Sequence, residues 1–280
     1  MPLDVVGIGS QLGIDFIGTP EGVKEFPGGN VANSLVVLQS LGLRTGYIGL
    51  VGTDQYTQRI LKDLTEGGID VSRIRRVSSP SPVCRIKIVK GDRILTFTGE
   101  KKKLEDFPEE DKAYLRTSRS AFLRASYLLA KEYANFAKQN GLEVFLSMHN
   151  TNPGGNFSFL EDIDFDALFA NEKEVKGIRS IDNLTAKGAE VIITKGDKGC
   201  SVYNSSGRID FPARRIYPLD PTGAGDAFAA GYMYGYLNGW KLERRAEFAN
   251  AVGAMATLQY GGRLRVRPEQ VLEFIGRSKS

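Results

Sequence analysis

The sequence contains a single histidine, His149, and two isolated cysteines, Cys84 and Cys200. These small numbers exclude zinc motifs and Cys–His nucleophiles, which need several such residues at characteristic spacings. A Ser–His–Asp triad in its usual arrangement is excluded as well, because no serine elbow accompanies the histidine. Chemistry in this chain must therefore use carboxylates, hydroxyls, backbone amides and basic side chains.

Long apolar runs and a strong net charge are also missing. No apolar stretch approaches the ~20 residues of a membrane span, and the N-terminal MPLDVVGIGS lacks the basic start and apolar block of a signal peptide. We therefore expect a cytoplasmic protein without a membrane partner. The net charge is only +4, and short basic clusters such as Arg73–Arg76 and Lys101–Lys103 are typical of a solvated surface. No nucleic-acid partner is expected.

Apolar runs that end in glycine alternate with helical patterns along much of the chain. Buried strands are predicted at residues 3–9, 45–52, 142–148 and 165–171, and at the end of 184–196. Helices are predicted at residues 30–42, 57–68, 127–141 and 244–262, and directly behind the glycine-rich turn at 223–225. This alternation favours an α/β fold with a mainly parallel sheet covered by helices on both faces.

Residues 83–99 follow a different pattern. Apolar and polar residues alternate on both sides of a Gly–Asp pair, which indicates an antiparallel hairpin, and a second hairpin is predicted at 199–213. The hairpin at 83–99 is either a lid over the edge of the sheet or a decorative surface hairpin, and both readings stay open on pattern alone. We expect a single domain over residues 1–280, with lid segments at about 12–27 and 78–100.

The segment DPTGAGDAF, residues 220–228, could carry chemistry. Gly223, Ala224 and Gly225 allow a tight turn whose amides point one way, and the helix behind them adds a partial positive charge. Such a turn binds phosphate and would stabilise the charge on a transferring phosphoryl group. Asp226 could accept a proton from a substrate hydroxyl. The alternative is a helix start that uses small residues only for close packing.

A second group of polar candidates lies near the N-terminus. Asp15 follows the first strand, where ligands of α/β sheets bind. In PGGNVANS, Gly28 and Gly29 permit a ligand to approach the backbone, and Asn30 and Asn33 offer amides to hydroxyls. The alternative is an ordinary helix start capped by Asn30. A P-loop is absent, and GIGSQLG misses the dinucleotide fingerprint by one residue.

Two polar segments follow predicted strands in the second half. In NEKE, residues 171–174, Asn171 and Glu174 would share a face of a helix and could order a hydrated magnesium ion. The alternative is a variant of the capping box. The turn TKGDKGCS, residues 194–201, suits the wall of a nucleotide site and a plain hairpin turn equally.

In their order along the chain, these segments resemble a known family. PGGNVANSLVVLQSLGLRTGYIGLVGTD and DPTGAGDAFAAGYMYGYLNG are similar to the two signatures of the ribokinase family, also called the pfkB carbohydrate kinases. The Asn-x-x-Glu and TKGDKG segments lie between them in family order. The resemblance covers nearly the whole chain, and the C-terminal signature is its most specific part.

The resemblance implies a three-layer α/β/α ribokinase-like fold with a small β lid. It also implies a phosphotransferase with an alcohol acceptor, which transfers the γ-phosphoryl group of ATP in the presence of Mg²⁺. Asp226 would be the catalytic base, and the amides of Gly223, Ala224 and Gly225 would form the anion hole. The other implied roles are acceptor binding by Asp15, Gly28, Gly29 and Asn33; magnesium ordering through water by Asn171 and Glu174; nucleotide binding by Thr194, Gly196, Gly199 and Asn250; and a monovalent cation, K⁺, at Asp220 and Thr222.

Two features depart from the family pattern. Only twelve residues separate Asp15 from Gly28, so we expect a lid built mainly from residues 83–99. His149, Asn150 and Asn152 stand where many relatives place an acidic residue and an arginine, which leaves the identity of the acceptor open. On the hairpin, Arg85 and Phe97 are further candidates for acceptor contact.

The preferred hypothesis is an ATP-dependent kinase that acts on a sugar or sugar derivative, as a monomer or homodimer. A nucleoside kinase of the same family and a non-catalytic nucleotide or sugar sensor are the alternatives. The complete glycine turn with Asp226 favours catalysis, since a sensor needs no base.

Overall fold

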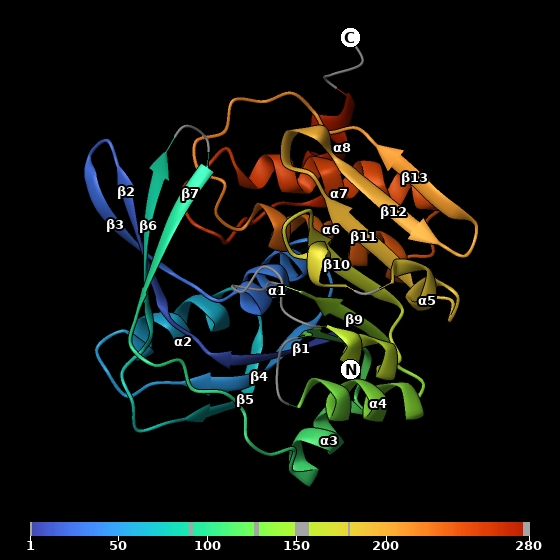
Figure 1. Ribbon diagram of the computed structural model, residues 1–280. Coiled ribbons are helices and arrows are strands. Elements are labelled where there is room, and N and C mark those ends of the chain that lie inside the picture. The colour runs from blue at the N-terminus through green and yellow to red at the C-terminus, as the bar shows by residue number, and fades with distance from the viewer. Residues whose placement is uncertain (1, 90–91, 126–128, 149–156, 179, 277–280) are drawn as a thin grey trace. The chain divides into compact units, whose positions relative to one another are not determined.

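A computed structural model describes residues 2–89, 92–125, 129–148, 157–178 and 180–276 (Figure 1). The chain falls into two compact units. Unit 1 comprises Met1–Val6 and Glu105–Arg215, and unit 2 comprises Gly7–Leu104 and Ile216–Ser280. The first strand, β1 (Leu3–Gln11), begins in unit 1 and ends in unit 2. The single domain expected over residues 1–280 stays a prediction.

Unit 1 is built on a mostly parallel sheet. Neighbouring strands from β8 to β11 run parallel, whereas β12 and β13 form an antiparallel hairpin on the end of the sheet. Short apolar runs buried on both faces are typical of parallel strands, and the middle residues of these strands are buried. The strands are β8 (Ser118–Arg124), β9 (Glu143–Ser147), β10 (Ala167–Asn171), β11 (Glu190–Thr194), β12 (Cys200–Asn204) and β13 (Gly207–Phe211).

Helices of unit 1 pack on this sheet through small apolar faces. In α4 (Ala130–Gln139), which packs against β8 and β9, the buried residues are Ala130, Tyr133, Ala134 and Ala137. This spacing of three and four residues places one stripe of the helix against the sheet. The other helices of unit 1 are α3 (Glu109–Leu115) and α5 (Ile181–Thr185), with the 3-10 turns η1 (Ser158–Asp162), η2 (Val175–Gly177) and η3 (Gly196–Lys198).

Unit 2 contains the rest of β1 and two further strands, β4 (Thr45–Val51) and β5 (Asp70–Arg76), which pair in parallel. Its helices α6 and α7 pack closely because Gly231 faces Ala249, so that a Cβ on Gly231 would lie 3.0 Å from the Ala249 Cα. Helix α1 in turn packs against α6. The helices of unit 2 are α1 (Asn30–Ser40), α2 (Thr57–Glu66), α6 (Ala224–Leu237), α7 (Leu242–Ala256) and α8 (Pro268–Gly276).

A separate sheet of four strands also belongs to unit 2. Its order is β3-β2-β6-β7, from β2 (Ile14–Thr19), β3 (Gly22–Pro27), β6 (Val83–Val89) and β7 (Asp92–Thr98). The hairpin predicted at residues 83–99 is confirmed. The expectation that this sheet comes mainly from 83–99 is wrong, because the short segment before Gly28 still forms two strands of six residues each.

The strand register fixes the two faces of this second sheet. Phe26, Asp15, Cys84 and Phe97 are partners across its four strands, so their side chains point to one side. We call this side the Asp15 face. It includes the buried cluster of Ile17, Cys84 and Ile86, against which Phe26, Ile88 and Tyr260 pack. Side chains of the intervening residues, Phe16 and Arg85 among them, point to the opposite face.

The α/β class, the large and mostly parallel sheet flanked by helices and the separate small sheet are confirmed. Two local predictions are wrong. The helix expected at 244–262 ends at Ala256, and residues 171–174 form a turn followed by a 3-10 helix rather than the start of an α-helix. Within the described residues, none of the helices combines the length and apolar character that crossing a membrane requires.

Candidate active site

The N-terminus of α6 begins at a tightly packed turn. Gly223 caps the helix with φ 77°, a left-handed conformation that a residue with a side chain adopts only with strain. It also lies against the backbone of Gly262, because a Cβ on Gly223 would be 2.5 Å from the Gly262 Cα. The first amides of a helix have no acceptor within the helix and carry its positive dipole end. The turn is therefore suited to an anion.

The two residues that follow differ from Gly223 in their surroundings. A Cβ on Gly225 would meet no atom of the described chain within 4 Å, so this part of the turn faces open space. Asp226 is half-buried in the first turn of α6. A carboxylate and an amide cradle thus share one helix start, which is the arrangement needed to orient a hydroxyl towards a phosphoryl group.

Asn33, on α1, contacts this carboxylate directly. Its Nδ2 donates a hydrogen bond of 2.8 Å to Asp226 Oδ2, and the neighbouring Ser34 hydroxyl donates one of 2.9 Å to the Asp226 carbonyl. The sequence predicted Asn33 as an acceptor ligand, and the structure adds this contact with Asp226. The Asn33 Oδ1 is buried and has no hydrogen-bond partner among the described residues, so it remains available to a ligand.

The beginning of α1 differs from the alternative in which Asn30 was expected to cap the helix. The N-cap is Gly29, with φ 116°, and Asn30 is the first helical residue rather than the cap. Asn30 Nδ2 is buried without a hydrogen-bond partner in the described chain. Because a buried donor without an acceptor is costly, this amide is suited to receive an oxygen from a ligand.

Asp15 and Gly28 lie next to each other at the base of the β2–β3 hairpin. The Gly28 N–H donates to the Gly13 carbonyl at 2.8 Å, and a Cβ on Gly28 would lie 2.6 Å from Asp15 Oδ1. Burial raises the pKa of the Asp15 carboxyl to about 6, against the opposing effect of Lys101. A carboxylate with so little stabilisation from the protein is well suited to accept hydrogen bonds from acceptor hydroxyls.

A short segment after α7 links these groups, and the sequence analysis missed it. The Gly261 N–H donates 2.9 Å to Asp220 Oδ2, and a Cβ on Gly261 would lie 2.6 Å from the Phe26 ring. Gly262 lies against both Gly223 and the Asn33 amide. The glycines of YGGRLRVR were the available signal, but the pattern was assigned to the preceding helix.

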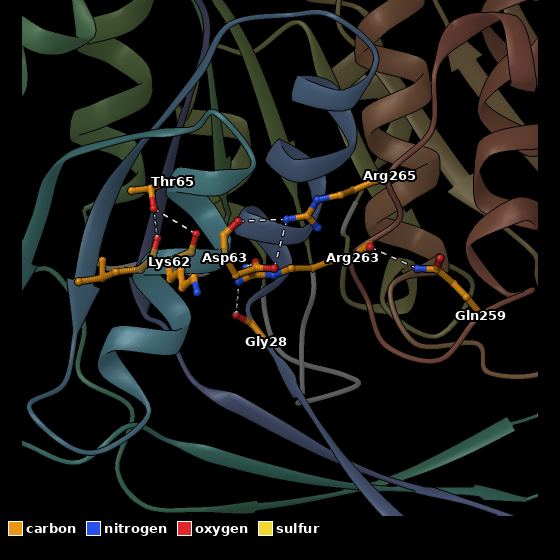
Figure 2. A network of polar contacts seen from close by, with 8 residues as sticks. Gly28, Lys62, Asp63, Thr65, Gln259, Arg263 and Arg265 are labelled. Carbon is orange, nitrogen blue, oxygen red and sulfur yellow. Dashed lines mark hydrogen bonds and ion pairs between the residues drawn. The ribbon is translucent and has the colours of Figure 1, made fainter.

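Arg263 follows these glycines and anchors the segment (Figure 2). Its guanidinium is buried, forms an ion pair with Asp63 on α2 and donates to the Gly28 carbonyl at 3.3 Å. Arg265 also binds Asp63, while Gln259 donates to the Arg263 carbonyl at 3.2 Å. Burial lowers the pKa of Arg263 to about 9, so the side chain stays charged at neutral pH. Through the hydrogen bond from Arg263, this network fixes the position of the Gly28 carbonyl.

Asp220 and Thr222, the residues proposed for a monovalent cation, are both buried. The Asp220 carboxylate accepts hydrogen bonds from the Thr222 and Gly261 amides, at 2.8 and 2.9 Å. Thr222 Oγ1 is buried and has no hydrogen-bond partner among the described residues. A carboxylate beside an unpartnered hydroxyl oxygen fits a hard cation, which prefers oxygen ligands.

The predicted nucleotide residues of unit 1 lie at the carboxyl end of β11. Thr194 is the last residue of this strand, and its hydroxyl donates to the Ala170 carbonyl at 3.3 Å. Gly196 begins the 3-10 turn η3, and Gly199 ends it with φ 91°. The Lys195 N–H donates to the Gly199 carbonyl at 2.7 Å, which closes the turn.

Asn171 and Glu174 lie beside this turn within unit 1, because Asn171 is the register partner of Thr194. The Asn171 side chain accepts hydrogen bonds from the amides of Lys173 and Glu174, and the Glu174 carboxylate accepts one from the Asn171 amide at 2.9 Å. This reciprocal arrangement is the capping-box alternative of the sequence analysis. A magnesium role for these residues stays a prediction.

Asn250, the remaining predicted nucleotide residue, is on α7 in unit 2. It is half-buried and lies one helical turn before Gly253, whose Cβ position is 3.2 Å from the Ala224 carbonyl. The structure therefore brings Asn250 near the glycine turn, together with Asp15, Gly28, Asn33 and Asp226. His149, Asn150 and Asn152 lie outside the described residues. Of the two hairpin candidates, Phe97 is on the Asp15 face, whereas Arg85 is on the other face with its guanidinium 5.1 Å from the Phe16 ring centre.

Comparisons with known proteins find sugar kinases that are similar to this chain over most of its length. The chain is 28% identical over 267 residues, covering 90% of it and 87% of the relative, to an ATP-dependent ribose-1-phosphate kinase from Halopiger xanaduensis. It is 25% identical to a 5-dehydro-2-deoxygluconokinase from Clostridium perfringens, covering 99% of this chain and 94% of that one. A structure of a putative ribokinase II from E. coli in complex with ATP and Mg²⁺ superposes with a TM-score of 0.84 at 22% identity, covering 98% and 99% of the two chains.

The last of these likenesses shows a ribokinase-like fold. A family profile, described as pfkB family carbohydrate kinase, matches residues 3–269, which include every predicted site residue. With the glycine turn, Asp226 and the first-helix asparagine in place, the chain belongs to the pfkB family of carbohydrate kinases.

Proposed function

We propose that this carbohydrate kinase transfers the γ-phosphoryl group of Mg-ATP to a hydroxyl of a sugar or sugar derivative, with Asp226 as the base. The observation that carries the proposal is the start of α6. There the half-buried Asp226 carboxylate is held by Asn33, and the adjacent turn at Gly225 faces open space. A phosphoryl group in this space would meet helix-start amides while its acceptor hydroxyl contacts the carboxylate.

The acceptor is bound by the residues around Asp15. Its carboxylate accepts hydrogen bonds from acceptor hydroxyls. Asn30 Nδ2 and Asn33 Oδ1, which have no hydrogen-bond partner among the described residues, supply a donor and an acceptor in return. The lack of a side chain at Gly28 leaves room for the Asp15 carboxylate beside it. Asp226 then orients one hydroxyl for in-line attack and takes its proton as the new oxygen–phosphorus bond forms, while the bond from the γ-phosphorus to the bridging oxygen breaks and ADP leaves.

We assign nucleotide binding to Thr194, Gly196, Gly199 and Asn250, and magnesium binding through water to Asn171 and Glu174. Support comes from the relative in complex with ATP and Mg²⁺ and from the polar turn at the end of β11. When bound, Mg²⁺ would offset the negative charge that develops on the phosphate oxygens. Asn171 and Glu174 keep acceptor oxygens at the strand end, where water ligands could be held.

A monovalent cation is proposed at Asp220 and Thr222. The unpartnered Thr222 hydroxyl supports it, because a bound cation would satisfy this buried oxygen. Since Asp220 holds Gly261 and Thr222 on either side of the glycine turn, a cation there would stiffen the anion hole.

The test is an ATP-consumption screen over pentoses, hexoses, ketosamines, sugar acids, sugar phosphates and nucleosides. We expect turnover with a sugar-type acceptor, and the Asp226→Asn variant should keep the fold while losing at least about 10³-fold in kcat. Preference for a nucleoside would select the nucleoside-kinase alternative. Near-normal turnover by Asp226→Asn, or binding of ATP without consumption over the whole panel, would contradict the proposal.

A further inference from the structure

We propose that the acceptor is an anionic sugar derivative, whose phosphate or carboxylate group is bound by Lys101 and Arg93 beside Asp15. This inference rests on the kinase function proposed above and specifies the class of its substrate. It assigns a role to a basic cluster that the sequence analysis attributed to the solvated surface.

Arg93 lies on the Asp15 face of the second sheet. On β7, Phe97 is in the same cross-strand row as Asp15 and Cys84, and Arg93 is four residues before it. Side chains alternate along a strand, so residues at even spacing point to the same side. Arg93 is the register partner of Ile88, which packs on the buried cluster of this face. Its guanidinium therefore extends over the side of the sheet that carries Asp15.

Lys101 is placed beside Asp15 by backbone contacts on either side. Thr98, at the end of β7, is the partner of Val83, which is itself the partner of Ile14. Four residues after Thr98, the Gln11 amide donates to the Lys102 carbonyl at 2.9 Å, and the Lys102 amide donates to the Gln11 side chain at 3.1 Å. The chain thus returns to the end of β1, close to the start of β2, with Lys101 between these two anchors.

Lys101 and Arg93 differ from other basic residues nearby in whether they form ion pairs with acidic side chains. Arg263 is neutralised by Asp63, and Lys102 by Glu100 at 2.7 Å. Neither Lys101 nor Arg93 forms an ion pair with an acidic side chain in the described part of the chain. Lys101 and Arg93 thus place two positive charges without an acidic ion-pair partner among the described residues near the Asp15 carboxylate, in surroundings that also include Asp220.

Lys101 and Arg93 both influence the pKa values of Asp15 and Cys84. Lys101 and Arg93 both oppose the effect of burial on the pKa of Asp15. Burial and the Asp15 carboxylate raise the pKa of the Cys84 thiol to about 11, and again Arg93 and Lys101 act in the opposite direction. Both cations thus lie close enough to Asp15 and Cys84 to act on each of them. A ligand whose hydroxyl binds Asp15 would place an anionic substituent within their reach.

The experiment compares matched acceptors and matched variants. Steady-state kinetics are measured with ribose 5-phosphate and ribose 1-phosphate against ribose, and with gluconate against glucose, so that the phosphate and carboxylate arms are separate. The variants are Lys101→Met and Arg93→Met. Their controls are Lys103→Met, two residues along the same cluster, and Lys87→Met, which lies on the opposite face of the second sheet. Thermal unfolding verifies that each variant folds.

We expect an anionic acceptor to be preferred over its neutral match. Lys101→Met and Arg93→Met should each lower kcat/KM for that acceptor by roughly 10- to 100-fold, the loss typical of a charge-assisted hydrogen bond. At about pH 8, where the Asp15 carboxyl is ionised in every variant, the KM for ATP and the rate with the neutral match should be unchanged, as should all rates of the two controls. The pair of acceptors whose kcat/KM ratio falls in these variants, sugar phosphate against ribose or gluconate against glucose, identifies the anionic group as phosphate or carboxylate.

A neutral acceptor preferred over every anionic match would overturn the inference while leaving the kinase function intact, as would equal losses on both members of a pair. If no acceptor of the whole panel led to ATP consumption, the proposed function would be removed instead, and this inference with it. The two failures are therefore distinguishable in one data set.

Discussion

Asn33 Nδ2 donates a hydrogen bond of 2.8 Å to Asp226 Oδ2, and these two residues are separated by 193 positions in the sequence. The contact connects the first signature of the family with the second, since Asn33 is on α1 and Asp226 begins α6. The hydrogen bond fixes the position of Asp226 Oδ2. The direction of Asp226 Oδ1 is then determined by the torsion angles of the Asp226 side chain. Asn33 is thereby a positioning residue for the proposed base.

Removal of this amide should impair turnover more than folding. We expect Asn33→Ala to lower kcat by roughly 10- to 100-fold, because a hydrogen bond to a charged group contributes about 1.5–3 kcal/mol. The KM for ATP should change little. Ser34→Ala is the matched control: it removes a hydrogen bond to the Asp226 backbone carbonyl and should lower Tm without a comparable loss of kcat. Equal effects of both variants on kcat would contradict the positioning role.

Two glycines of one turn should respond oppositely to the same substitution. Gly223→Ala introduces a side chain at φ 77° and against Gly262, so we expect a clear fall in Tm, with strain of about 1–2 kcal/mol from the backbone alone. Gly225→Ala adds a methyl group into open space and should leave Tm unchanged while reducing kcat. Full activity of a stable Gly225→Ala protein would show that no phosphoryl group occupies that space.

The raised pKa of Asp15 leads us to expect a pH dependence of acceptor binding. Burial raises the pKa of Asp15 from 3.8 to about 6, opposed by Lys101, Arg263 and Arg93 and reinforced by Asp220. Since the ionised carboxylate binds hydroxyls, kcat/KM for the acceptor should rise with pH through about 6. Lys101→Met removes an opposing charge and should move this limb to higher pH, whereas Lys103→Met should not. An unchanged limb in Lys101→Met would contradict the electrostatic contact.

The same pKa determines the sign of a stability change. Between pH 3.8 and about 6 the folded state retains a proton that the unfolded state has lost, so the contribution of Asp15 to the unfolding free energy falls as pH rises through this window. We expect Asp15→Asn to raise Tm at pH 7.5, with the gain disappearing below about pH 4. Calorimetry at both pH values tests this, and acceptor turnover should be lost in the same variant.

The Arg263–Asp63 pair should behave as a buried ion pair. Asp63→Ala leaves the buried guanidinium with a much weaker counter-charge, and we expect the unfolding free energy to fall by about 3 kcal/mol. The double variant Asp63→Ala with Arg263→Met should recover much of this loss, because both charges are then absent. Denaturant titration of the single and double variants gives the coupling. Because Arg263 also binds the Gly28 carbonyl, both should raise the KM of the acceptor.

Much of the main sheet was predictable because β1, β4, β9, β10 and β11 are short apolar runs. The prediction found neither β8, which begins with polar residues, nor β5, whose Arg73, Arg75 and Arg76 resembled a solvated cluster although they lie in an edge strand beside β4. An edge strand pairs with another strand on one side only and often carries charged side chains. These charged residues hide the apolar pattern from which a strand is predicted. The β2–β3 hairpin was given too little weight for a similar reason: it is short and mostly polar.

The residues of the site with a local motif were found, and those that act at long range were not. Asp226 and the glycine turn form a contiguous pattern, whereas the partners of Arg263 are Asp63 and Gly28, 200 and 235 positions away. Nothing in the local sequence distinguishes Lys101 from Lys103. Their difference arises only when Lys102 is bound to Gln11 and the chain passes the start of β2.

Asp15 belongs to β2, a strand of the small sheet, rather than to the scaffold that carries Asp226. The carboxylate that we assign to acceptor binding thus lies in the small sheet, together with Arg93 on β7. If the small sheet acts as the lid that the sequence analysis considered, its movement would change the affinity for the acceptor, because Asp15 would move with it. Acceptor binding and exclusion of water from the phosphoryl donor would then be coupled.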